Sequence, residues 1–162
     1  MKLVPNRILY LMENNNDSCN EEEVILHNNK FMVLKDLKHK NTSYHYTAWI
    51  KEDIRSLIEM NQSIIDSIQD IRKYLLDQSI ITETHTAFIH FPPQFWRLHV
   101  HFVQDNHIFE APEHEIIKVD DIIQYYQKDA NYFVKNIRLL QPPKNKSSDR
   151  KNLNIINQDW LY

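Results

Sequence analysis

The sequence predicts a single α+β domain in which short antiparallel strands form one sheet and one long helix covers it. Three observations support this fold class. Short apolar segments alternate with Asn-rich turns, a stripe of isoleucine and leucine follows at helical spacing, and two alternating segments meet at Pro92-Pro93. With 162 residues, the chain is long enough for one domain with a substantial core.

The first part of the chain predicts short strands joined by tight turns. We expect strands at residues 8–12, 23–27 and 30–35, followed by a polar connection at residues 38–46. Because the chain has no glycine, Asn and Asp are the residues best able to enter left-handed backbone conformations. The expected turns are Asn14-Asn15-Asn16, Asn28-Asn29 and Asp105-Asn106.

From residue 54 to residue 75, the apolar residues recur at the spacing of a helix. The apolar stripe consists of Ile54, Leu57, Ile58, Ile64, Ile65, Ile68, Ile71 and Leu75, which predicts one long helix whose apolar face covers the sheet. Residues 119–127 predict a second, shorter helix near the C-terminus. Residues 108–111 and 132–140 are expected to be short extended segments. We expect residues 1–140 to form the domain and residues 141–162 to form a polar C-terminal tail.

Two neighbouring segments carry the candidate chemistry. Residues 86–91 alternate as a strand, and the two prolines place residues 95–103 as its antiparallel neighbour. On that second strand Arg97, His99 and His101 share one face, and His90 comes close to them. We expect the apolar face to be buried and the imidazole face to be open. Side chains roughly 6 to 7 Å apart along a strand can contact one polyphosphate.

Composition excludes several classes of protein. The formal charge of -3 argues against a general nucleic-acid coat, so any anion binding must be local. The absence of glycine excludes the dinucleotide fingerprint and the P-loop, so side chains must hold any phosphate. Cys19 is the only cysteine, which leaves no intrachain disulfide and indicates a reducing compartment. Neither a signal peptide nor a membrane span is recognisable.

The residues from His90 to Phe102, read as HFPPQFWRLHVHF, resemble the active-site segment of the histidine triad superfamily. Within it, the chain resembles the scavenger mRNA-decapping enzymes. Asp36-Leu37-Lys38 and Phe109-Glu110-Ala111-Pro112 match two further patches of those enzymes in the same order. The similarity covers residues 8–140, which correspond to the C-terminal catalytic domain, and the smaller N-terminal domain is expected to be missing.

The resemblance implies a histidine triad fold and a two-step hydrolysis of the mRNA cap. His99 would attack the phosphate next to 7-methylguanosine, and water would then release 7-methylguanosine monophosphate from the covalent nucleotidyl-histidine. No metal or other cofactor is implied. The substrate-binding residues that it implies are Asp36 and Leu37 in the base pocket and Lys38, His90, Arg97 and His101 on the phosphates.

The side chains allow this chemistry. A neutral imidazole is a competent nucleophile, and we expect Arg97 to lower the pKa of His99 by like-charge repulsion. Arg97 stands where the family has its first triad histidine, and a permanent cation cannot shuttle a proton, so slower turnover is expected. Gln94 and Phe95 replace two hydroxyl residues of the family. Glu21 is the nearest candidate for the acidic residue that reads the base.

The resemblance also implies a homodimer that acts on a capped dinucleotide or short capped RNA, with no membrane or DNA partner. A cytoplasmic location is expected, with the nucleus as the alternative. Without a closing domain, the site is expected to be open and to discriminate less against longer capped RNA.

Other interpretations remain open for the same residues. The histidines could be incidental on an exposed strand face, or His90, His99 and His101 could bind zinc. A triad hydrolase of other nucleotide polyphosphates or phosphoramidates and a non-catalytic cap or nucleotide binder are the functional alternatives. His39 and His45 are interpreted as surface residues.

Overall fold

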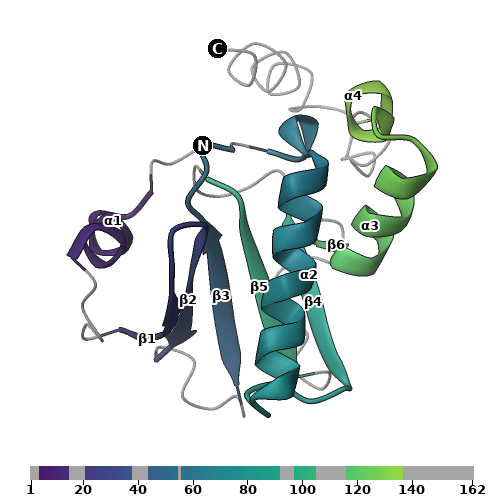
Figure 1. Cartoon of the computed structure of the whole chain (residues 1–162). Coiled ribbons are helices and arrows are strands. Elements are labelled where there is room, and N and C mark those ends of the chain that lie inside the picture. The colour runs from purple at the N-terminus through teal and green to yellow at the C-terminus, as the bar shows by residue number, and fades with distance from the viewer. Residues whose placement is uncertain are drawn as a thin grey trace, which may run out of the picture.

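The computed structural model describes residues 4–14, 21–37, 44–54, 56–91, 97–104 and 116–136. Within them, one antiparallel sheet has the strand order β1-β2-β3-β5-β4-β6 (Figure 1). Its strands are β1 (Glu22–His27), β2 (Phe31–Asp36), β3 (His45–Ile50), β4 (His85–His90), β5 (His99–Gln104) and β6 (Ile116–Lys118). The helices are α1 (Asn6–Asn14), α2 (Gln62–Asp77), α3 (Val119–Lys128) and α4 (Tyr132–Asn136), with a 3-10 turn η1 (Leu57–Glu59). The predicted α+β class is confirmed.

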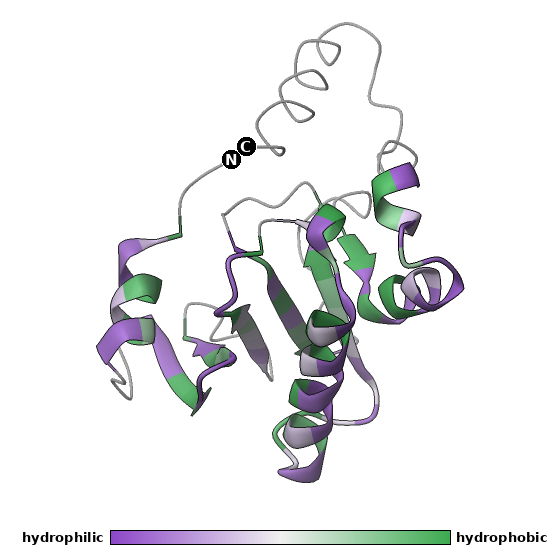
Figure 2. Ribbon diagram, turned by 45° about the horizontal axis from the view of Figure 1, so that its top comes forward, coloured by the Kyte–Doolittle hydropathy of each residue, from purple (hydrophilic) through white to green (hydrophobic). Residues whose placement is uncertain are grey.

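One face of the sheet carries the main core and is covered by α2, which crosses in front of β4 and β5 in Figure 1. Bands of hydrophobic and hydrophilic residues alternate along α2, as expected for a helix with one buried face (Figure 2). Its buried residues meet inward-facing residues of the strands such as Val33, Ala48, Val100 and Phe102. The predicted covering helix therefore has the expected role.

The opposite face of the sheet is partly covered by α1. Val4, Ile8 and Leu11 pack against Met32, Leu34 and Trp49, which form a second cluster separate from the main core. The prediction of a strand at residues 8–12 is wrong. A short apolar run does not distinguish strand from helix by periodicity, and the spacing of Ile8 and Leu11 is helical.

Strand β3 lies at the centre of the sheet, between β2 and β5. The polar connection predicted for residues 38–46 therefore extends too far, because β3 begins at His45. All six residues of β3 are buried, since α1 and α2 cover parts of both faces. Burial therefore does not alternate along β3 as it does along a half-exposed strand.

The long helix predicted over residues 54–75 is two elements, η1 and α2. Asn61 divides them because its side-chain oxygen accepts the Ile64 N–H at 3.1 Å and caps α2. At the other end, Ser79 has φ 55°, and the N–H groups of Ser79 and Ile80 donate to the carbonyls of Leu76 and Leu75. This is a Schellman termination in which serine occupies the usual glycine position.

The remaining predictions divide into three groups. The Asn28-Asn29 turn is confirmed, with the Asn28 side chain accepting the N–H groups of Lys30 and Phe31 at 2.8 and 3.0 Å. The second helix is confirmed as α3. The strand predicted over residues 132–140 is wrong at residues 132–136, because α4 begins at Tyr132, whose N–H donates to the Asp129 carbonyl, and residues 137–140 lie outside the described residues. The turn at Asp105-Asn106 and residues 108–111 and 141–162 lie outside the described residues.

Among the residues that the structure describes, no helix has the length and apolar run needed to cross a bilayer.

Candidate functional site

Four histidines gather on the face of the sheet opposite α2. They come from three neighbouring strands: His45 from β3, His99 and His101 from β5, and His90 from β4. His101 is at the centre, and the centroid of its ring lies 5.0 Å from that of His99, 4.7 Å from that of His90 and 5.3 Å from that of His45. Alternation along β5 produces this arrangement, because Val100 and Phe102 face the main core.

His99 is held in a defined orientation and tautomer. Its ring is 5% exposed and stacks on Trp49, with ring centroids 4.1 Å apart. Its Nδ1 lies 3.1 Å from the Arg97 carbonyl oxygen. Because a carbonyl can only accept, Nδ1 carries the proton and the lone pair of the neutral ring lies on Nε2. A neutral ring in this tautomer can act as a nucleophile through Nε2.

Burial keeps this imidazole neutral. Desolvation lowers the pKa of His99 to about 4, the hydrogen bond to the Arg97 backbone opposes that shift, and the charge of His90 adds to it. The predicted direction is therefore right, but the predicted cause is wrong, because burial and not Arg97 repulsion is dominant. The expectation of an open imidazole face is also wrong at His99, which is 5% exposed and whose ring packs against Trp49 and His101.

Arg97 immediately precedes β5 and has φ 70°, an uncommon conformation for a residue with a Cβ. Its carbonyl meets His99 Nδ1, and its Nη1 lies 3.7 Å from the Met12 sulfur of α1. The neighbouring Leu98 is fixed by backbone hydrogen bonds from its N–H to the Ile54 carbonyl and from the Ile50 N–H to its own carbonyl. The strand predicted over residues 95–103 thus has described strand geometry only from His99 onward.

Two residues of this cluster were not predicted, His45 and Trp49. His45 is 5% exposed, so its interpretation as a surface residue is wrong. Its Nε2 lies 3.0 Å from His101 Nδ1, and its Nδ1 lies 3.5 Å from the Asp36 carboxylate. Alternation of Tyr44, Tyr46 and Ala48 toward the main core could have identified β3 and placed both residues on the histidine face.

The residues predicted to bind substrate lie around this cluster where they are described. Asp36 ends β2 and contacts His45, and Leu37 follows with its N–H 2.6 Å from the Glu21 carbonyl. His90 ends β4 and meets His101 edge to face. Glu21 pairs with Arg7 at 3.1 Å. Lys38, Gln94, Phe95 and the Phe109-Glu110-Ala111-Pro112 patch lie outside the described residues.

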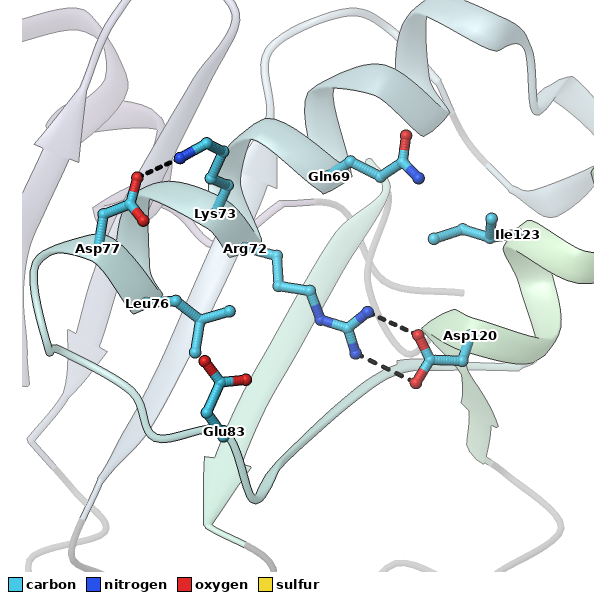
Figure 3. A pocket seen from close by; sticks show the side chains of 8 residues that line it. All are labelled: Gln69, Arg72, Lys73, Leu76, Asp77, Glu83, Asp120 and Ile123. Carbon is cyan, nitrogen blue, oxygen red and sulfur yellow. Dashed lines mark hydrogen bonds and ion pairs between the residues drawn. The ribbon is translucent and has the colours of Figure 1, made fainter.

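A metal centre and a groove between α2 and α3 are the two other kinds of site to compare with the histidine cluster. No group of three or more His, Cys, Asp or Glu side chains within the described ranges has an arrangement that could hold a metal ion. A groove of about 400 Å³ lies between α2 and α3, on the side of the sheet opposite the histidines (Figure 3). Arg72 spans the groove by a bidentate ion pair with Asp120. This contact lowers the pKa of the Asp120 carboxyl and is typical of a structural ion pair.

An antiparallel sheet covered by a long helix on one face, with a histidine row on the other, defines a protein of the histidine triad type. The comparisons identify the family. The family model described as "Scavenger mRNA decapping enzyme C-term binding" matches residues 11–116, and the chain belongs to this family.

A solved structure described as "Hnt3 in complex with DNA and guanosine" shares the fold, with a TM-score of 0.53 and 14% sequence identity. The match covers 70% of this chain and 73% of that chain. No curated protein matches the sequence. Fold and family together support a nucleotide-binding domain of hydrolase type.

Proposed function

We propose that this protein hydrolyses the 5′ cap of a capped dinucleotide or short capped RNA and releases 7-methylguanosine monophosphate. The observation that carries the proposal is the contact between His99 Nδ1 and the Arg97 carbonyl, which assigns the lone pair of a neutral ring to Nε2. Family membership supplies the class of substrate. The pKa of about 4 supports a ring that is unprotonated near neutral pH.

The proposed reaction has two displacements at phosphorus. In the first, His99 Nε2 forms a bond to the phosphate next to 7-methylguanosine, and the bond from phosphorus to the bridging oxygen of the leaving diphosphate breaks. In the second, a water oxygen bonds to phosphorus, the electron pair of the N–P bond returns to Nε2, and the water loses its proton. Arg97, His90 and Lys38 would neutralise the non-bridging oxygens, His101 would lie beside the transferred phosphoryl group, and Asp36 and Leu37 would contact the base.

The test is a reaction with a methylated cap dinucleotide, followed by mass detection. The expected products are 7-methylguanosine monophosphate and a guanosine diphosphate, and a brief incubation should give a protein adduct of one nucleotidyl group. His99→Gln should give neither the adduct nor product above the uncatalysed rate. Undiminished turnover in His99→Gln would exclude the proposed nucleophile.

A second candidate is hydrolysis of other nucleotide polyphosphates or phosphoramidates, favoured by the structural similarity to a protein solved with DNA and guanosine. A panel of methylated and unmethylated guanine dinucleotides, an adenine dinucleotide, a nucleoside phosphoramidate and a 5′-adenylated DNA separates the two. Cap hydrolysis requires the methylated guanine substrate to have the highest kcat/KM. Tight binding with no product and no adduct would favour a non-catalytic binder.

The assembly and the location belong to the same proposal. We propose a homodimer in a cytoplasmic compartment, as the family resemblance implies. Light scattering during gel filtration should give twice the chain mass of 19.6 kDa. A monomer at micromolar concentration would contradict the dimer without affecting the assignment of His99.

A further inference from the structure

We propose that His45 is a positioning residue that, together with Asp36, sets up His101 as the general base for hydrolysis of the nucleotidyl-His99 intermediate. This inference rests on the proposed function and adds to it a three-residue arrangement, Asp36-His45-His101, called here the relay. The relay joins β2, β3 and β5 on the histidine face.

The contacts of the relay favour one set of proton positions. The Asp36 carboxylate, 3.5 Å from His45 Nδ1, can only accept, so it favours a proton on that nitrogen. The neutral His45 ring then has its lone pair on Nε2, which faces His101 Nδ1 at 3.0 Å and accepts its proton. The neutral His101 ring is left with its lone pair on Nε2. The same logic that assigns the nucleophile in His99 thus assigns a base in His101.

The surroundings of the pair favour a positive charge on His101 after it takes a proton. Asp36 is the carboxylate that contacts the pair, and it lies opposite Glu22 in the register between β1 and β2. Glu22 is already bound by the Arg7 guanidinium, with Nε 2.9 Å from both carboxylate oxygens. Among the described residues, His99 and His90 are the other histidines in ring contact with His101, and protonation of either would oppose the charge on His101.

The chemical step balances within these groups. As water attacks phosphorus, its proton moves to His101 Nε2, and its oxygen forms the new P–O bond. The N–P bond breaks and its electron pair returns to His99 Nε2. His101 is then an imidazolium whose Nδ1–H is hydrogen-bonded to His45, and His45 remains oriented by Asp36. Release of the proton to solvent restores the starting state.

The relay also accounts for a departure from the family. Arg97 stands where the family has its first triad histidine, and a guanidinium cannot give or take a proton near neutral pH. A proton acceptor must therefore come from elsewhere on the histidine face. His101, with its ring centroid 5.0 Å from that of His99, is a histidine close to the nucleophile and hydrogen-bonded to a buried partner.

The experiment separates the two chemical steps in the full chain. Wild-type protein and His45→Leu are mixed with a methylated cap dinucleotide, and the protein adduct is followed by rapid quenching and mass detection. His45→Leu should form the adduct at a rate within about threefold of wild type and hydrolyse it about tenfold or more slowly, because a general base contributes roughly 10²–10⁴-fold. The adduct should therefore accumulate in the variant.

Two further variants serve as controls. His45→Gln retains an amide oxygen that can accept the His101 Nδ1–H, so its hydrolysis rate should lie between those of wild type and His45→Leu. His85→Gln changes a histidine of β4 that accepts a hydrogen bond from Arg72 Nε and donates one to the Thr82 carbonyl, and both rates of this variant should equal those of wild type. An equal loss in both steps, or unchanged adduct hydrolysis in His45→Leu, would overturn the inference.

A measurement on the wild-type protein tests the relay even if a variant does not fold. Nitrogen-15 NMR of the histidine rings near neutral pH should show His101 protonated on Nδ1, and a neutral ring protonated on Nε2 would overturn the relay. If wild type hydrolyses the cap while His101 has the wrong tautomer, the relay alone fails. If wild type forms neither product nor adduct, the proposed function fails and the relay fails with it.

Discussion

At the scale of single residues, the site depends on a buried imidazole that is kept neutral by its surroundings. Trp49 covers one side of the His99 ring, and the Arg97 carbonyl holds Nδ1–H. Burial opposes the charged form, so the ring does not need a neighbouring cation to remain neutral. The same burial makes the stability of the fold dependent on pH.

The first prediction concerns that dependence. The pKa of His99 falls from 6.5 to about 4 on folding, so between these values the unfolded chain binds a proton that the folded chain does not. Stability should therefore fall as the pH decreases through this window, by up to about 3 kcal/mol. Urea unfolding between about pH 7 and about pH 4 measures the loss, and His99→Gln should reduce its slope. An equal slope in both proteins would contradict the assigned pKa.

The sequence predicted the contacts between site residues that lie close together in the chain, but not the contacts between residues of distant strands. The spacing of His99, His101 and His90 was enough to place their rings together, because strand alternation and one proline break fix their geometry. The role of His45 was not predictable from spacing, because its partners come from β2 and β5. The cause of the His99 pKa shift depends on Trp49, which reaches the ring from a different strand.

At the scale of elements, α1 forms one boundary of the histidine face and is attached by two ion pairs of Arg7, with Glu21 and Glu22, and by a small apolar cluster. Arg7 of α1 binds Glu22, whose side chain is 5% exposed, while Arg7 itself is 40% exposed. Met12 of the same helix contacts Arg97. The docking of α1 therefore affects the position of Arg97 next to His99, the proposed nucleophile.

The second prediction tests this docking. Arg7→Met leaves the Glu22 carboxylate buried without its cation, which should destabilise the protein by about 2 kcal/mol. Hydrogen exchange should become faster in α1 and remain slow in α2. Lys73→Met is the matched control, because it removes an exposed pair with Asp77 and should cost less than about 0.5 kcal/mol. Equal effects of the two substitutions would show that α1 is held by its apolar contacts alone.

The third prediction concerns the end of α2. Ser79 has φ 55° in a chain without glycine, and a residue with a Cβ is disfavoured in this conformation. Ser79→Gly should stabilise the protein by about 0.5 to 1 kcal/mol, with the cost of greater freedom in the unfolded chain included. Gln69→Gly, in the middle of the same helix, should destabilise by a similar amount. Thermal unfolding measures both, and a loss of stability in Ser79→Gly would contradict the backbone assignment.

The way in which each element is buried explains whether the sequence could predict it. Strands β1 and β2 are joined by an Asn turn with its own chemistry, and α2 has one apolar face, so local signals identify them. Helix α1 and strand β3 depend on burial by distant segments. The five consecutive apolar residues 8–12 are compatible with a strand or a helix. The helix is favoured because it packs Ile8 and Leu11 into the second cluster, on the histidine face of the sheet.

At the scale of the whole molecule, the two faces of the sheet have different roles. The face under α2 holds the main core, whereas the other combines the α1 cluster with the histidines. The formal charge of the chain is -3, so long-range attraction does not draw a polyanion to the protein. The proposed phosphate binding must therefore come from a few side chains at the site, in agreement with the expectation from the charge balance of the sequence.

The fourth prediction follows from this charge distribution. If only cap phosphates are bound, each added nucleotide of a longer capped RNA lies outside the site and releases no further counterions. The KM values of a cap dinucleotide and of a capped RNA of about twenty nucleotides should therefore rise with the same slope against the logarithm of salt concentration, between about 50 and 200 mM. A protein that binds downstream phosphates would give a steeper slope for the longer RNA. That result would mean that a second anionic contact exists away from the histidine face, and it would contradict the local character of the site.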